Sequence, residues 1–134
     1  LRYEQQSANA QTLLKWLKDQ RQFAQVLHPS DESSPGHQYW QEICTTDQSA
    51  GLVSVIFKPE YDITAVRRFC DALELFKLGF SWGGPVSLVM LYDLKMMRKL
   101  ENTHLQQGLL VRFCIGLEDP QDLIQDIENA LKQL

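Results

Sequence analysis

Apolar residues recur along the chain at helical and at alternating spacings, and the helical spacing predicts three amphipathic helices. In residues 4–19, leucines stand three and four positions apart with lysines and an aspartate between them. Similar spacing occurs in residues 62–73 and 119–134, and each of these segments begins at an aspartate that can cap the first helical N–H groups. Pro120 suits the first position of the last helix. We therefore expect each helix to bury one face.

Alternating segments predict strands between these helices. Residues 51–58 (GLVSVIFK) and 109–116 (LLVRFCIG) are rich in β-branched and aromatic residues, and their side chains alternate between the two faces of a strand. Shorter strand candidates cover residues 23–27, 78–80 and 86–90. We expect these segments to pair with one another in a sheet.

The remaining segments are connections. Residues 28–37 (HPSDESSPGH) form a loop rich in proline, serine and glycine, and a short helix is compatible with residues 37–43. The polar segment 93–107 predicts a loop with some helix. The order of elements favours an α+β fold, in which helices pack on one face of a mostly antiparallel sheet of four to five strands. Residues 1–134 are long enough for a single domain.

Charge and composition narrow the classes of partner. The formal net charge of −4 argues against nucleic acid, which favours a basic surface. No apolar run approaches membrane-spanning length, so we expect no membrane contact. The three cysteines have no metal-like spacing and the three histidines stand far apart, so we expect buried thiols, no metal site and a reducing, cytoplasmic setting. The acidic pair Glu118 and Asp119 at a helix start is interpreted as capping rather than acid–base chemistry.

Arg112 interrupts the apolar run of residues 109–115. Strand alternation places it opposite Val111 and Phe113. A guanidinium keeps its proton and needs water, a carboxylate or another anion as its partner. Two interpretations remain open, an arginine on the solvated face of a half-buried sheet or a bidentate clamp on a carboxylate.

A long loop joins two of the short strands. Residues 78–89 (LGFSWGGPVSLV) contain more loop residues than a hairpin needs, and Trp82 stands directly before two glycines, which allow φ > 0 and close approach of other groups. Either the tryptophan packs and holds a wide turn, or the loop directs backbone N–H groups toward a ligand. If the loop lies beside Arg112, the two would form a site for the carboxylate of an amino acid.

These motifs resemble a known family. FSWGG (80–84), followed by LLVRFCIGLEDPQDLIQDIENAL (109–131), is similar to the C-terminal end of the Cys/Met-metabolism pyridoxal-phosphate enzymes, which include cystathionine synthases and lyases and methionine γ-lyase. VLHPSDESSPGHQYW (26–40) and SAGLVSVIF (49–57) resemble two further segments of that family. Trp82, where many relatives carry a smaller apolar residue, is most similar to the bacterial cystathionine β-lyases.

The resemblance implies site residues and a reaction. Arg112 would hold the substrate α-carboxylate, Ser81 and the backbone of Trp82 would flank this carboxylate and the cofactor's imine, and the Trp82 ring would anchor the loop. The implied parent is a cytoplasmic homotetramer of methionine biosynthesis. It would convert a cystathionine-like substrate by β-elimination, giving homocysteine, pyruvate and ammonia, with pyridoxal phosphate as the electron sink.

The sequence also differs from the family pattern. Pro85-Val86-Ser87 replaces an aromatic-Glu-Ser motif, and residues 106–108 (QQG) replace a Ser/Thr-rich approach to the arginine strand. The imine-forming lysine and the other cofactor-binding residues of the family would lie in a preceding large domain. We therefore expect that this chain is a single C-terminal domain without catalytic residues, and that alone it neither holds pyridoxal phosphate nor turns over substrate. The alternatives are a non-catalytic amino-acid-binding module, a subunit-contact module, and a domain of a cystathionine γ-synthase or γ-lyase.

Overall fold

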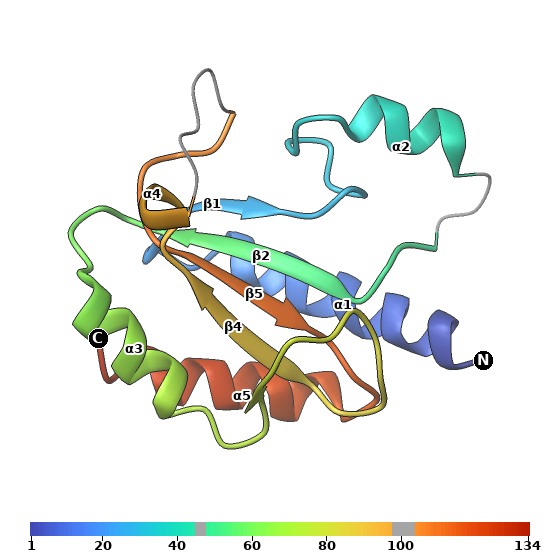
Figure 1. Ribbon diagram of the computed structural model, residues 1–134. Helices are drawn as coiled ribbons and strands as arrows, with labels where there is room; N and C mark the ends of the chain where they lie inside the picture. Colours follow the sequence, from blue (N-terminus) through green and yellow to red (C-terminus); the bar gives the residue numbers. More distant parts are fainter. Residues whose placement is uncertain (45–47, 98–103) are drawn as a thin grey trace.

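A five-stranded sheet with helices against one face forms the body of the protein (Figure 1). The computed structural model describes residues 1–44, 48–97 and 104–134. In chain order, its elements are α1 (Arg2–Lys18), β1 (Phe23–Leu27), α2 (His37–Ile43), β2 (Leu52–Phe57), α3 (Ile63–Asp71), β3 (Lys77–Leu78), β4 (Leu88–Tyr92), α4 (Leu94–Met97), β5 (Leu110–Cys114) and α5 (Pro120–Leu131).

The strands lie in the order β1-β2-β5-β4-β3. β2 pairs with β1 and β5 in antiparallel fashion, as β4 does with β5, whereas β3 runs parallel to β4. The expected α+β fold is thus confirmed, but its sheet is mixed. The parallel pair arises because residues 79–87 carry the chain back before β4 begins, so that β4 runs in the same direction as β3.

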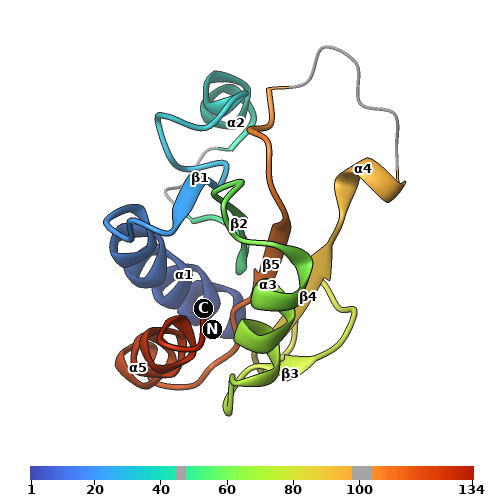
Figure 2. The same cartoon turned by 90° about the vertical axis from the view of Figure 1, so that its left-hand side faces the viewer.

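Strand alternation separates a buried face from an open face. On the buried face, side chains of β2, β4 and β5 meet apolar residues of α1, α3 and α5, which cover this side of the sheet (Figure 2). Phe57 and Phe113 each contact Phe69 edge to face, with ring centroids 5.2 and 6.4 Å apart. Full burial of such a side chain stabilises the fold by roughly 1.5–3 kcal/mol. The fully buried members of this core include Leu13, Leu17, Val53, Val55, Phe57, Val66, Phe69, Val89, Val111, Phe113, Leu123 and Ile127.

Local signals in the sequence determine where the helices begin. The side chains of Asp62 and Asp119 accept hydrogen bonds from the N–H groups of Ala65 and Gln121, each at 2.8 Å, so both predicted caps are confirmed. Pro120 occupies the first turn of α5 as predicted. The structure also confirms the short helix at residues 37–43.

The short strands and the polar segment differ in detail from the prediction. β3 and β4 cover residues 77–78 and 88–92 instead of 78–80 and 86–90. Part of the polar segment 93–107 is helical as α4, while residues 98–103 lie outside the described residues. Within the described ranges, no helix has both the length and the apolar character needed to cross a membrane.

The prediction that the cysteine thiols are buried is confirmed for two of the three. Cys70 and Cys114 are buried, Cys44 is half-buried, and all three are free. Burial, followed by the charge of Asp71, raises the pKa of Cys70 to about 12. Burial also raises the pKa of Cys114. These two thiols therefore remain protonated and behave as apolar side chains.

Candidate functional site: an arginine on the open face of the sheet

Arg112 lies on the face of the sheet opposite the helices. Its neighbours Val111 and Phe113 are fully buried in the core, and Arg112 itself is half-buried. It forms one row across the sheet with Ser54 on β2 and Met90 on β4. Because β5 has a partner strand on each side, the sheet fixes the starting point of the Arg112 side chain.

The guanidinium of Arg112 contacts the loop between β3 and β4. Its Nη2 donates a 3.4 Å hydrogen bond to the carbonyl oxygen of Ser81, and its Cζ lies 5.6 Å from the ring centroid of Tyr92. The Tyr92 ring in turn meets Phe80 edge to face, at 6.2 Å. The structure therefore brings together the strand arginine and the SWGG loop, which the sequence had suggested as parts of one site.

The guanidinium has no ionic partner in the part of the chain that the structure describes. The ion pairs there join the N-terminus to Glu4 and Lys18 to Asp31. A half-buried cation without a carboxylate beside it is suited to bind an anion from outside. Whether that anion is a substrate carboxylate stays a prediction.

The prediction that the Trp82 ring anchors the loop is wrong. Its side chain is 81% exposed and is not packed into the domain. The two glycines that follow have ordinary φ values, and a methyl group on either would meet no described atom within 4 Å. The Ser81 hydroxyl turns back to donate a hydrogen bond to the Gly83 carbonyl at 3.0 Å. Thus Ser81 contacts Arg112 through its carbonyl oxygen, and the loop gains no support from the indole.

Hydrogen bonds at the far end of the loop hold it in place. Gln6 donates to the Gly84 carbonyl at 2.7 Å, and the N–H of Leu117 donates to the Pro85 carbonyl at 2.9 Å. The Glu118 carboxylate accepts from the N–H and the hydroxyl of Ser87, at 2.7 and 2.8 Å. The interpretation of Glu118 as a cap is therefore wrong, because only the side chain of Asp119 caps α5.

Sequence reasoning missed the role of these polar residues. Gln6 stands on a polar stretch of α1, where nothing in the pattern distinguishes it from a solvated residue. Asp126 offered a better signal, because it falls between Leu123 and Ile127 on the apolar stripe of α5. It is buried and accepts hydrogen bonds from three consecutive backbone N–H groups before β3, at residues 74–76.

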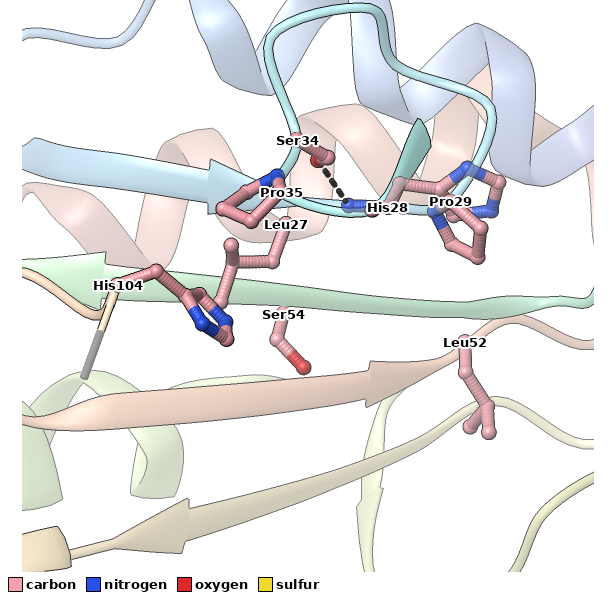
Figure 3. Close-up of a pocket in the computed structure, with 9 residues that line it drawn as sticks. Leu27, His28, Pro29, Ser34, Pro35, Leu52, Ser54 and His104 are labelled. Carbon is pink, nitrogen blue, oxygen red and sulfur yellow. Dashed lines mark hydrogen bonds between the residues drawn. The ribbon is translucent and has the colours of Figure 1, made fainter. Parts of the chain in front are cut away.

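A pocket of about 300 Å³ lies on the same face, beside the Arg112 row. Ser54 belongs both to this row and to the pocket wall, which Figure 3 shows together with Leu27 of β1 and His104. The described residues that line it are Leu27, His28, Pro29, Ser34, Pro35, Gly36, Leu52, Ser54 and His104. The wall is mostly apolar, with a few polar side chains.

His28 has a structural position in this wall. Its Nδ1 lies 2.7 Å from the Ser30 hydroxyl and its Nε2 lies 3.0 Å from the Ala50 carbonyl, so both ring nitrogens have partners. Burial lowers the pKa of His28, which favours the neutral ring. Among the described residues, no three His, Cys, Asp or Glu side chains gather as metal ligands.

Comparison with known proteins decides the family. A sequence profile described as "Cys/Met metabolism PLP-dependent enzyme" matches residues 1–132. The chain belongs to this family. It is 34% identical to the cystathionine β-lyase of Bordetella avium over 98% of the chain and 32% of that protein. It is 31% identical to the cystathionine β-lyase MetC of Escherichia coli over 100% of the chain and 34% of that protein.

Other known proteins are about as similar to the chain. An L-alanine/L-glutamate racemase of Wolbachia pipientis is 30% identical over 99% of the chain and 32% of that protein. The crystal structure of metB from Corynebacterium glutamicum superimposes with a TM-score of 0.80 at 29% identity, over 98% of this chain and 33% of that one. The chain thus spans about a third of the length of the curated relatives it matches.

A solved structure from Campylobacter jejuni, described as an O-acetylhomoserine (thiol)-lyase, contains a pyridoxyl-lysine phosphate. It has a TM-score of 0.79 and 27% identity, over 98% of this chain and 29% of that one. Among the described residues that line the pocket beside Arg112, none is a lysine, so this pocket does not supply the lysine that such a group needs. Lys18 is paired with Asp31, and Lys77 donates to the Glu74 carbonyl.

Proposed function

We propose that the chain is the C-terminal domain of a pyridoxal-phosphate-dependent carbon–sulfur lyase similar to cystathionine β-lyase. In this proposal it contributes the site for the substrate α-carboxylate. The observation that carries the proposal is the half-buried guanidinium of Arg112, which contacts the Ser81 carbonyl and the Tyr92 ring and has no carboxylate within 4 Å among the described residues.

The geometry of Arg112 suits a planar carboxylate. A guanidinium has five N–H donors, and one of the Nη2 donors is used by the Ser81 carbonyl. The remaining donors can form two parallel hydrogen bonds to an amino-acid carboxylate. Such a charged hydrogen bond contributes about 1.5–3 kcal/mol. The Ser81 carbonyl contacts this guanidinium, which supports the proposal that Ser81 and the adjoining Trp82 backbone flank the same carboxylate.

The cofactor belongs to another part of the proposed enzyme. Pyridoxal phosphate supplies the electron sink for chemistry at the α-carbon of an amino acid. The pocket beside Arg112 has no lysine among its described lining residues, which supports the proposal that residues outside this chain hold the cofactor. The contribution of this chain is to bind the carboxylate and so orient the α-carbon. The proposed parent reaction is the conversion of L-cystathionine to homocysteine, pyruvate and ammonia.

The decisive experiment uses the complete reading frame that contains this chain. We expect the purified protein to form pyruvate from L-cystathionine. Arg112→Gln should raise KM by about 10- to 150-fold, the equivalent of losing a charged hydrogen bond. Arg68→Lys, at an exposed position of α3, serves as the control. Unchanged kinetic constants in Arg112→Gln would exclude the carboxylate role.

A non-catalytic amino-acid-binding module is the second candidate. It is favoured because the chain has its own core and places Arg112 against the loop through contacts within this chain. Calorimetric titration of the chain alone with L-cystathionine separates the two functions. Measurable affinity that Arg112→Gln abolishes, together with a reading frame that encodes no cofactor domain, would support the binding module and exclude the lyase.

A further inference from the structure

We propose that Glu118 is a positioning residue for the carboxylate site. It fixes the end of the loop of residues 79–87, so that the Ser81 carbonyl meets the guanidinium of Arg112. This inference rests on the proposed function of Arg112 and adds to it a residue that does not touch the bound anion.

The Glu118 carboxylate uses both of its oxygens on one residue of the loop. Oε1 accepts from the Ser87 N–H at 2.7 Å and Oε2 from the Ser87 hydroxyl at 2.8 Å. The Ser87 hydroxyl oxygen also accepts from the N–H of Gly116 at 2.9 Å, and Ser87 is completely buried. A buried serine with two charged hydrogen bonds has little freedom to move, because a displacement of Ser87 or of Glu118 would leave buried polar groups without partners.

Close backbone contact accompanies these hydrogen bonds. A methyl group on Gly116 would lie 2.5 Å from the Pro85 carbonyl oxygen and 2.8 Å from the Ser87 nitrogen. It would also lie 2.5 Å from Oε2 of Glu118. The start of β4 and the end of β5 therefore approach each other as closely as glycine permits, with the Glu118 carboxylate at their junction.

Helix α1 holds Glu118 itself. The buried Asn9 side chain donates from Nδ2 to the Glu118 carbonyl at 3.0 Å and to the Gly116 carbonyl at 3.2 Å. Since α1 packs into the main core through Leu13 and Leu17, the carboxylate is tied to the rigid part of the domain. Glu118 thus holds the loop in a fixed position relative to α1 and β5.

The two ends of the loop determine where Ser81 lies. At one end, the N–H of Gly79 donates to the Val89 carbonyl at 3.3 Å, and at the other Glu118 holds Ser87. Trp82 provides no alternative anchor because its side chain is exposed. Loss of the Glu118 carboxylate removes two of the hydrogen bonds at this end of the loop, where Gln6 and the Leu117 N–H still bind the Gly84 and Pro85 carbonyls. The contact between Ser81 and Arg112 is then less firmly supported.

The test compares Glu118→Gln and Glu118→Ala with Asp119→Asn, which changes the neighbouring carboxylate but keeps a residue that caps helices well. In the complete enzyme we expect Glu118→Ala to raise KM for L-cystathionine about tenfold with little change in kcat. Glu118→Gln, which keeps one acceptor oxygen, should give a smaller rise. Hydrogen exchange at the Ser87 and Gly116 amides should accelerate in the same order, and Asp119→Asn should change neither KM nor the exchange rates.

A double-mutant cycle adds a second readout. Ser87→Ala removes the other half of the hydrogen-bonded pair, and its effect on KM should be less than additive with that of Glu118→Gln. Faster amide exchange without a change in KM would overturn the proposal, because Glu118 would then have only a structural role. Should Arg112→Gln also leave KM unchanged, the proposed function itself fails. If Glu118→Ala does not fold, Glu118→Gln and the cycle decide.

Discussion

Tyr92 is a second residue that contacts the guanidinium of Arg112. Its ring lies 5.6 Å from Cζ of Arg112, within the range of cation–π attraction. In the complete enzyme, we expect Tyr92→Leu to raise KM about fivefold, the equivalent of about 1 kcal/mol. Tyr92→Phe keeps the ring face and its contact with Phe80, and should stay close to the wild-type KM. Equal effects of the two substitutions would show that the hydroxyl, not the ring, is important.

His28 gives the stability of the domain a defined dependence on pH. Burial lowers the pKa of His28 in the folded state, so the unfolded chain binds a proton more readily. The full stability is therefore present above the unfolded value of about 6.5 and is lost as pH falls below it. Urea unfolding between pH 8 and pH 5 should show this decline, and His28→Asn should flatten it. His104→Gln removes an exposed histidine and serves as the control.

Among the helices and strands, the sequence predicted those in which apolar and polar residues recur at a regular spacing. β2 and β5 alternate between half-buried and buried positions over their first four residues, and α3 and α5 have both a cap and an apolar stripe. β3 has two residues, too few to display any period, and its parallel pairing depends on the path of residues 79–87. The order of the strands in the sheet could not be derived either, because the residue pattern of a strand does not determine which other strand pairs with it.

The junction of β5 and α5 depends on one glycine. Gly116→Ala would place a methyl group 2.5 Å from the Pro85 carbonyl oxygen, and backbone atoms there cannot move aside without shifting both strands. We expect the free energy of unfolding to fall by about 2–3 kcal/mol. Gly83→Ala is the matched control, since a methyl group there meets no described atom within 4 Å. Similar urea midpoints for the two variants would contradict this account.

At the scale of the whole molecule, β3 and the loop after it carry several exposed apolar side chains. Phe80 and Trp82 are 74% and 81% exposed, and Leu78 and Val86 are exposed beside them in the sequence. Exposed apolar patches next to an edge strand favour association. We expect the chain alone to self-associate with increasing concentration in sedimentation velocity runs, and Phe80→Ser/Trp82→Ser to reduce this. Tyr39→Ser, an exposed aromatic position on α2, should not.

Sequence analysis could identify only those residues of the candidate site whose chemical type differs from that of their neighbours in the chain. Arg112 was identifiable because a permanent cation stands in an apolar strand, and its face followed from alternation. The support of the loop was not identifiable, because Glu118 and Gln6 act through tertiary hydrogen bonds between residues 31 and 78 positions apart. Trp82 attracted attention by its size, yet packing in this chain gives it no anchoring role.

The central place of β5 in the sheet has a consequence for natural variation in length. Inserting one residue between Gly108 and Arg112 would turn the arginine side chain inward, into the apolar layer, and disturb the ladders on both sides of the strand. The turn that carries Trp82 has open space around it and accommodates added or deleted residues more easily. Homologues should therefore keep the spacing from Gly108 to Gly116 constant, while insertions and deletions collect in the connecting segments.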